Sequence, residues 1–297
     1  MHFNTNFKRI FGSLMERITN YTSPSAIFIL SFLKRFLLFS LLACCVAGSN
    51  ATELTGSMVK SRMGHSITSL VDGKVLVAGG ISAWYGASYA ELFDPQTGSF
   101  VLTGAMQVAR SGHAAALLAD GRVLVVGGAT TDNRGNNITL ASTEIFDPVS
   151  GTWTLSPSMQ NASATPIART LADGRIMVIN YKNGATSAEV FDPISFGFSA
   201  AGNLITSRSG FTATALADGK LLVAGGLTTG NTSTILNSAE LWDPATSTWL
   251  ATGNMGAARM NAAASLLADG KVLLTGGIGN GASTAISEIY DPVSGSL

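Results

Sequence analysis

The chain has 297 residues, of which 46% are hydrophobic but only 12% are charged, and its formal net charge is zero. A typical soluble domain carries about 25% charged residues, so small neutral polar side chains must cover much of this surface. Together with the 33 glycines, this composition favours an all-β chain that is rich in strands and turns. A nucleic-acid binder needs clustered Lys and Arg against several phosphates, and the zero charge balance excludes nucleic acid as a partner.

The N-terminal region has the pattern of an export signal. Residues 26–47 form an apolar stretch that Lys34 and Arg35 interrupt, so neither half reaches the roughly 20 residues of a membrane-spanning helix. Lys34 and Arg35 end a basic region, residues 36–42 form a short hydrophobic region, and residues 49–51 are a small-x-small cleavage site. The pattern predicts export to the periplasm, to an anchor at the outer membrane, or out of the cell. The basic region is long, so Met15 or a later position is an alternative start.

Two cysteines leave the form of this segment open. The run Leu41-Leu42-Ala43-Cys44 resembles a bacterial lipoprotein box, in which Cys44 becomes the lipidated N-terminus. The alternative is that Cys44 and Cys45 are small apolar residues of an ordinary signal peptide. No other cysteine exists, so the rest of the chain can form no disulfide. We therefore expect residues 1–51 to be a signal peptide or lipoprotein-type segment, and a lipid on Cys44 to be the sole route to a membrane.

The remaining sequence is repetitive. An Asp-Gly pair lies between two short apolar runs in each repeat, which predicts a β-hairpin closed by a type I′ turn, with positive φ at both central residues. Gly-Gly follows in four of the repeats, then a loop of variable length, and then Glu-x-aromatic-Asp-Pro, whose proline ends a third strand. An aromatic residue marks a fourth strand. The Asp-Gly pairs begin at Asp72, Asp120, Asp173, Asp218 and Asp269, and the fourth-strand aromatics are Phe100, Trp153, Phe198 and Trp249.

This order of features resembles the Kelch repeat, over residues 52–297. The resemblance implies an all-β fold, a Kelch-type β-propeller of five four-stranded blades. Thr52 to Met58 begins at the repeat position where the last repeat stops, so we expect residues 52–58 to supply the missing fourth strand and close the ring. The alternative is a fragment of a six- or seven-bladed ring, since five blades are unusual for this family.

Residues that recur in every repeat are expected to build the blades, because five copies of one catalytic group cannot reach one substrate. The third-strand glutamates should accept hydrogen bonds from backbone groups or from a series of arginines, since buried charges must be paired. Of the acids after residue 47, only Glu53 and Asp132 stand outside the repeated positions, so paired catalytic carboxylates are hard to assemble. The glutamates are Glu91, Glu144, Glu189, Glu240 and Glu288, and the arginines are Arg62, Arg110, Arg208 and Arg259.

The repeats contain few side chains that could bind a metal ion or act as a nucleophile. His65 and His113 are the histidines after residue 47, at one position of adjacent repeats, and we interpret both as hydrogen-bonded scaffold residues. Copper sites of the galactose-oxidase kind occur on Kelch-type propellers, but they need a cysteine, which is missing here. No Ser-His-Asp or Cys-His pattern stands out, and we expect neither a metal nor a cofactor.

Positions that differ between repeats are the candidates for binding. The loops between second and third strands vary most, and loops on a rigid scaffold are the usual place of binding sites. Their aromatic side chains can stack on a sugar or anchor a protein, and their polar ones can reach a ligand. Decoration of a solvated loop is the alternative for each. The candidates are Trp84, Tyr85, Asp132, Asn133, Arg134, Tyr181 and Lys182.

The third repeat departs from the others. It has Asn180-Tyr181 in place of Gly-Gly and Ser163 in place of the recurring arginine. Arg169 occupies a position where the other repeats have Thr, Ala or Ser. Arg169 is therefore either an anion anchor in the channel of the propeller or a structural replacement that pairs with Glu189.

These residues are compatible with two functions. The first is an exported non-enzymatic module whose variable loops bind a protein or a glycan. The second is a carbohydrate-active enzyme similar to the Kelch-type sialic acid mutarotases, in which Arg169 would hold a carboxylate. An enzyme needs several unlike polar side chains at one place, whereas a binding module does not.

Overall fold

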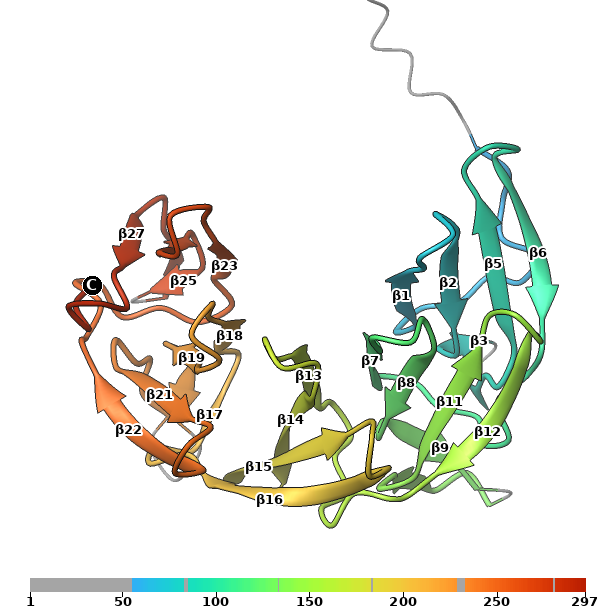
Figure 1. The fold of residues 1–297 in the computed structure, drawn as a ribbon, viewed down its shortest axis with the longest axis horizontal. Helices are drawn as coiled ribbons and strands as arrows, with labels where there is room; N and C mark the ends of the chain where they lie inside the picture. Colours follow the sequence, from blue (N-terminus) through green and yellow to red (C-terminus); the bar gives the residue numbers. More distant parts are fainter. Residues whose placement is uncertain (1–54, 83–84, 133, 183, 229–232, 280) are drawn as a thin grey trace, which may run out of the picture. The chain divides into compact units, whose positions relative to one another are not determined.

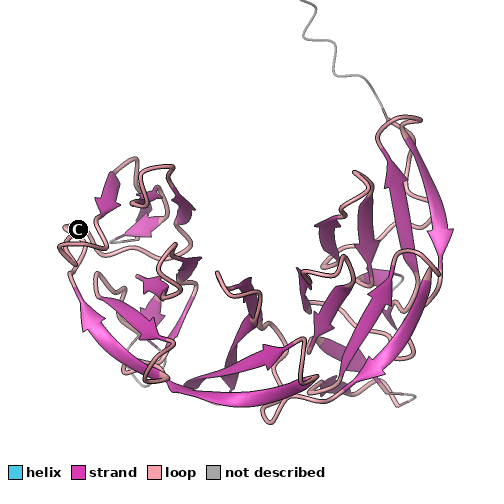
Figure 2. Ribbon diagram, in the orientation of Figure 1, coloured by secondary structure: helices cyan, strands magenta, loops and turns pink. Residues whose placement is uncertain are grey.

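The computed structural model describes residues 55–297, with the exception of residues 83–84, 133, 183, 229–232 and 280. The described part is one compact unit that begins at Thr55. It consists of strands and loops without a helix (Figure 2), and so contains no helix with the length and hydropathy of a membrane span. The expectation of an all-β chain is confirmed. The segment 1–51 with Cys44 and Cys45 lies outside the described residues, and its role in export stays a prediction.

Five antiparallel sheets of three or four strands follow one another along the chain, from the blue-green to the red part of Figure 1. We call each sheet a blade. Blade 1 contains β1 (Ser66–Ser69), β2 (Val75–Ala78), β5 (Ala90–Asp94) and β6 (Ser99–Thr103). Blade 2 contains β7 (Ala114–Leu117), β8 (Val123–Val126), β11 (Thr143–Asp147) and β12 (Thr152–Ser156). Blade 3 contains β13 (Ile167–Thr170), β14 (Ile176–Lys182), β15 (Ala185–Asp192) and β16 (Gly197–Asn203). Blade 4 contains β18 (Thr212–Ala215), β19 (Leu221–Ala224), β21 (Ala239–Asp243) and β22 (Thr248–Thr252). Blade 5 contains β23 (Ala263–Leu266), β24 (Val272–Thr275) and β27 (Ser287–Tyr290). In each blade the strands are paired in chain order, as expected for the repeat.

The Asp-Gly pairs lie in hairpin turns, but the turn is not the predicted type I′. In blade 1 the amide of Leu70 donates to the carbonyl of Lys74 at 2.8 Å, which closes a three-residue loop. Only Gly73 of that loop has a positive φ, at 85°, whereas Asp72 does not. Asp72 caps the turn instead, because its Oδ1 accepts from the amide of Lys74 at 3.0 Å. The turn is thus a type I turn followed by a left-handed glycine, the second common way to close a hairpin.

Gly-Gly ends the second strand and redirects the chain into the variable loop. The first glycine of the pair has a φ between 61° and 67° in the four blades that have one, Gly79, Gly127, Gly225 and Gly276. Several loops then form small two-stranded sheets: β3 (Ile81–Ser82) with β4 (Tyr85–Gly86), β9 (Ala129–Thr131) with β10 (Asn137–Thr139), and β25 (Ile278–Gly279) with β26 (Ala282–Ser283). In blade 4, β20 (Leu227–Thr228) pairs instead with β17 (Arg208–Ser209).

The hydrophobic core lies between neighbouring blades. Leu76 and Ala90 of blade 1 pack against Val123 and Phe146 of blade 2, and three further clusters join the later blades in the same way. A cross-blade hydrogen bond supports this packing, since Trp153 Nε1 donates to the carbonyl of Gly104 at 2.9 Å. Each sheet is too small to bury its own apolar face, so the blades are stable only side by side.

Among the described residues, blade 5 has no fourth strand. The fifth sheet has three strands, in the order β23-β24-β27. Residues 55–58 form no strand, although the amide of Gly56 donates to the carbonyl of Gly98 in blade 1 at 2.6 Å. Residues 52–54 lie outside the described part. Closure of the ring by residues 52–58, and with it the number of blades, therefore stays a prediction.

Candidate functional site

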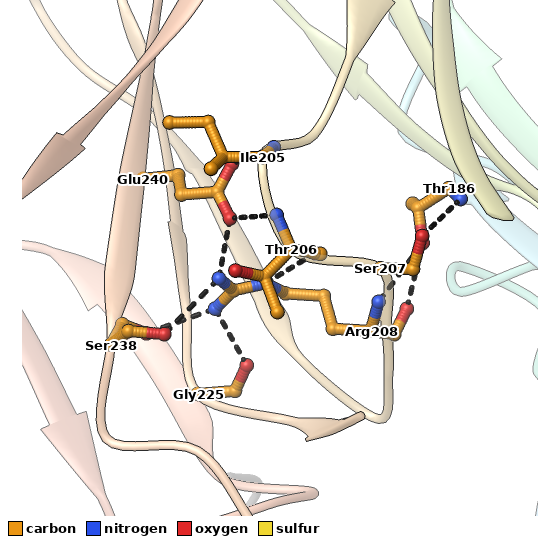
Figure 3. A network of polar contacts seen from close by, with 8 residues as sticks. All are labelled: Thr186, Ile205, Thr206, Ser207, Arg208, Gly225, Ser238 and Glu240. Atoms are coloured by element: carbon orange, nitrogen blue, oxygen red, sulfur yellow. Dashed lines mark hydrogen bonds and ion pairs between the residues drawn. The ribbon is translucent and has the colours of Figure 1, made fainter. Parts of the chain in front are cut away.

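A buried ion pair recurs at one position of the blades, and blade 4 shows its construction (Figure 3). Arg208 Nη2 donates to Glu240 Oε1 at 2.5 Å, and Nη1 donates to the carbonyls of Gly225 at 3.0 Å and Ser238 at 2.9 Å. The Glu240 carboxylate also accepts from two backbone amides, those of Ile205 and Thr206. Burial lowers the pKa of Arg208, and the Glu240 carboxylate opposes that change. An arginine starts from a pKa so high that it stays charged.

The same module lies in three other blades, as the sequence predicted. It pairs Arg62 with Glu91, Arg110 with Glu144, and Arg259 with Glu288. In each, Nη1 also donates to the carbonyl of the first glycine of the Gly-Gly pair. In each of these blades the arginine and the glutamate join the loops of the blade through buried, paired charges.

Blade 3 builds the module without an arginine. Ser163 stands at the arginine position, and Glu189 accepts from the amides of Gln160 at 2.7 Å and Asn161 at 3.0 Å. Asn180 replaces the first glycine, and its Nδ2 donates to Glu189 Oε1 at 3.0 Å. The structural alternative for Arg169, a pair with Glu189, is therefore wrong, because the side-chain amide of Asn180 donates to Glu189 in place of a guanidinium. The paired departure of Ser163 and Asn180 in one repeat is the sequence signal that could have shown it.

Arg169 lies on β13, beside the first strand of the next blade. Its Nε donates to the carbonyl of Ala213 on β18 at 2.8 Å, and its Nη1 donates to the carbonyl of Ala168 at 2.8 Å. Among the described residues no carboxylate forms an ion pair with Arg169. The side chain is exposed in part, so it presents an uncompensated positive charge next to the first strands.

His113 belongs to the packing between blades 1 and 2, and His65 stands at the same position of blade 1. His113 is buried, and its Nε2 lies 2.8 Å from Ser66 Oγ of the preceding blade. Burial, with a smaller effect of Arg110, lowers the pKa of His113 to about 3, so its ring is neutral. Burial also lowers the pKa of His65. A neutral imidazole with so low a pKa is a poor base. The contact of His113 with Ser66 could not be predicted from the sequence, because the two residues belong to different blades. The Nδ1 atoms of both histidines find no hydrogen-bond partner within the described part.

The loop candidates lie at the edge of the blades opposite the Asp-Gly turns. Asp132 and Arg134 share the β9–β10 ribbon, where the Asp132 carboxylate accepts from the amides of Arg134 at 2.9 Å and Asn136 at 2.8 Å. The Asn136 side chain, which also donates to the Asp132 carboxylate, lowers the pKa of Asp132 most, and the backbone amides lower it further. These bonds commit the carboxylate to the turn, and Arg134 is exposed. Tyr181 is half-buried on β14. The backbones of Tyr85 and Lys182 lie in β4 and β14, and Trp84 and Asn133 lie outside the described residues.

The structure brings some of these candidates together but does not join all of them. Strands β4 and β9 are in contact, so the loops of blades 1 and 2 are neighbours. Arg169 lies on the first strand of blade 3, apart from both ribbons. A groove of about 470 Å³ lies at the opposite edge, between turn residues 70–72, residues 119–121 and Pro148–Val149, and none of the candidates lines it. Within the described ranges, no three His, Cys, Asp or Glu side chains converge as a metal site would require.

Comparisons with known proteins agree with this architecture. The Kelch motif matches residues 109–160 and 207–256, which cover β7 to β12 and the strands of blade 4. The solved structure of YjhT is similar, with a TM-score of 0.58 and 15% sequence identity over 76% of this chain and 80% of that one. No curated protein matches the chain in sequence. The repeated four-stranded blades, the Kelch motifs at two places and the structural likeness together show an all-β fold of the Kelch β-propeller type.

Proposed function

We propose that the chain is an exported, non-enzymatic binding module that presents the loops between second and third strands to a protein or a glycan. A Kelch-type fold supports an interaction role in general. One observation carries the proposal further: the loops of blades 1, 2 and 5 are folded ribbons of unlike sequence on one common scaffold. Preformed loops of this kind bind with little loss of conformational entropy.

The chemistry of the described side chains supports binding and not catalysis. The glutamates accept hydrogen bonds within the blades, the turn aspartates cap their own loops, and His113 is neutral and buried. General acid–base catalysis needs a titrating group within reach of a substrate. The ribbons of blades 1 and 2, which touch through β4 and β9, offer aromatic and polar side chains instead.

The experiment is a protein and glycan array screen with residues 52–297, followed by loop variants. We expect Trp84→Ala with Tyr85→Ala, and separately Arg134→Ala, to weaken binding about tenfold or more, while stability changes by about 0.5 kcal/mol or less. The matched control is Val149→Ser, an exposed change at the opposite edge of the blades. Unchanged affinity in all loop variants would move the binding site elsewhere.

A second function is carried by Arg169, whose guanidinium pairs with no carboxylate of the described chain. In this alternative the chain resembles the sialic acid mutarotases, and Arg169 holds the carboxylate of an acidic sugar. The test is the unfolding temperature with and without sialic acid, in the wild type and in Arg169→Lys. A rise in the unfolding temperature with sialic acid that occurs in the wild type but not in Arg169→Lys would support this second function. Equal unfolding temperatures in the wild type with and without sialic acid would contradict it.

A further inference from the structure

The groove between blades 1 and 2 lies at the edge of the Asp-Gly turns, away from the variable loops. Its volume is about 470 Å³, and aliphatic side chains from both blades line it. Val71 and Val149 are 79% and 95% exposed, whereas all residues of β8 are buried. Val71 reaches toward blade 2, since a Cβ added to Gly121 would lie 3.7 Å from its Cγ2. Exposed apolar side chains gathered in one groove indicate a contact surface for another molecule.

The sequence sets this groove apart from the equivalent places between the other blades. The position of Val71 holds alanine in every other repeat, at Ala119, Ala172, Ala217 and Ala268. The position of Val149 holds Gln96, Ile194, Ala245 and Val293 in the other repeats. Two valines therefore come together in sequence only at the junction of blades 1 and 2. The hairpin turn does not require a valine, since four repeats build the same turn with alanine.

Blade 3 shows how an aromatic ring occupies the corresponding junction. Phe196, in the turn after the third strand, lies with its ring centre 5.1 Å from the Arg122 guanidinium of blade 2. It also packs against the core cluster that joins blades 2 and 3. Blade 2 has Gly151 at the position of Phe196, and blade 1 has Lys74 at the position of Arg122. Glycine has no side chain, so blade 2 supplies no such ring beside Lys74.

The turns around the groove carry an excess of negative charge. Lys74 pairs with Asp72 at 3.0 Å, and both Asp72 and Asp94 raise the pKa of Lys74, so one ammonium group serves two carboxylates. Blade 2 repeats this arrangement of two aspartates around Arg122. Each of the two blades thus brings one uncompensated carboxylate to this edge. A negative rim attracts positively charged partners.

We propose that this groove binds a short segment of a partner protein in which an aromatic side chain lies between basic residues. The aromatic side chain would pack against Val71 and Val149, and the basic residues would contact the carboxylates of the turns. Enclosed pockets bury most of a small ligand, whereas these valines are open to solvent and surrounded by charges, as in the contact surfaces of proteins. The groove is independent of any ligand of the variable loops, which lie at the opposite edge.

The test titrates the purified full chain with three short peptides that are acetylated and amidated at their ends. The first is Gly-Lys-Phe-Lys-Gly, the second replaces both lysines by glutamate, and the third replaces phenylalanine by serine. We expect the first peptide to bind about fivefold or more tightly than the other two, and less tightly as the salt concentration rises. Amide chemical shifts should change at Val71, Gly121 and Val149.

Two variants test the place of binding. Val71→Ala introduces the alanine of the other repeats, and Gly151→Phe introduces the ring of blade 3 at a position with a similar φ, 68° against 57°. Each should weaken binding of the first peptide about fivefold or more. The matched control is Val293→Ala, which removes a 97% exposed valine from the same turn of blade 5 and should leave the affinity unchanged.

The proposal is overturned if the first peptide does not bind, or if all three peptides bind equally. It is also overturned if the chemical shifts change only at other residues, or if Val293→Ala weakens binding as much as Val71→Ala. Val71→Ala decides the matter alone where Gly151→Phe does not fold, because alanine stands at this position in four repeats. Neither outcome depends on whether the variable loops bind a ligand.

Discussion

At the scale of single residues, burial decides what each charged side chain can do. Arg208 is fully buried and holds a buried carboxylate, whereas Arg169 donates to two backbone carbonyls and lies partly in solvent. Removing one partner of a buried pair leaves a charge without compensation, and removing a donor to a backbone carbonyl does not. The two arginines should therefore differ strongly in their contribution to stability.

We expect Arg208→Ala to lower the free energy of unfolding by about 3–5 kcal/mol and Arg169→Ala to lower it by about 1 kcal/mol. The reason is that Glu240 loses its partner in the first variant, while Glu189 keeps Asn180 in the second. Urea unfolding of both variants beside the wild type checks this. A loss above about 3 kcal/mol in Arg169→Ala would show that its contacts were wrongly assigned.

His113 predicts a pH dependence of stability. Its pKa falls from 6.5 to about 3 on folding, so the unfolded chain binds a proton between these values that the folded chain does not. Stability contributed by the neutral ring is therefore complete above about pH 6.5 and decreases as the pH falls toward 3. The loss at pH 5 is roughly 2 kcal/mol.

The matched variant is His113→Phe, because blade 4 has Phe211 at this position. We expect the difference in unfolding free energy between wild type and variant to change by roughly 2 kcal/mol between pH 8 and pH 5. Carboxylates that titrate in this range do so in both proteins, so the comparison isolates His113. A difference that does not depend on pH would show that the ring is not buried as the structure has it.

At the scale of elements, the hairpins and third strands could be predicted because their signals are local. An Asp-Gly pair between apolar runs and a proline after the third strand each act within a few residues. The turn type could not be predicted, since Asp-Gly suits both a two-residue and a three-residue loop and the bond from Leu70 to Lys74 decides between them.

The partner of Glu189 was missed for another reason. Asn180 is nine residues away in sequence, and only the pairing of β14 with β15 places it beside the carboxylate.

The exchange in blade 3 predicts a coupling between Ser163 and Asn180. Ser163→Arg alone places a guanidinium against the Asn180 side chain, and overpacking of this kind costs about 1–3 kcal/mol. Asn180→Gly alone removes a donor to a buried carboxylate, which costs about 1.5–3 kcal/mol. The double variant restores the module of the other blades, so its cost should be smaller than the sum by about 0.5–3 kcal/mol. Unfolding of the wild type and the three variants in guanidinium chloride completes the double-mutant cycle. Additive losses of unfolding free energy would contradict the assignment of these positions.

At the scale of the whole molecule, four interfaces between blades hold the core, and among the described residues one face of blade 1 and one face of blade 5 pack against no other blade. Ile289 of blade 5 is 49% exposed, whereas Ile145 and Val190 at the same position are 1% and 2% exposed. The face is also more polar than its equivalents, because Thr275 and Ser287 stand where blade 1 has Ala78 and Ala90. The sequence could not reveal this difference in burial, which arises from what lies beside the blade. An interface here would be weaker than the four that the structure shows.

Closure of the ring by residues 52–58 can be tested by deletion. If this segment is the fourth strand of blade 5, its deletion leaves an unpaired edge and should lower the unfolding temperature and broaden the transition. The deletion also removes the bond from the Gly56 amide to Gly98, which is worth only about 1 kcal/mol. Gly56→Ala provides the control, since its Cβ would lie 2.8 Å from the Gly98 carbonyl oxygen and disturb that contact alone. If residues 52–58 close the ring, the deletion must lower the unfolding temperature clearly more than Gly56→Ala does. Equal midpoints and equal sharpness in deletion and control would show that the segment is no blade strand.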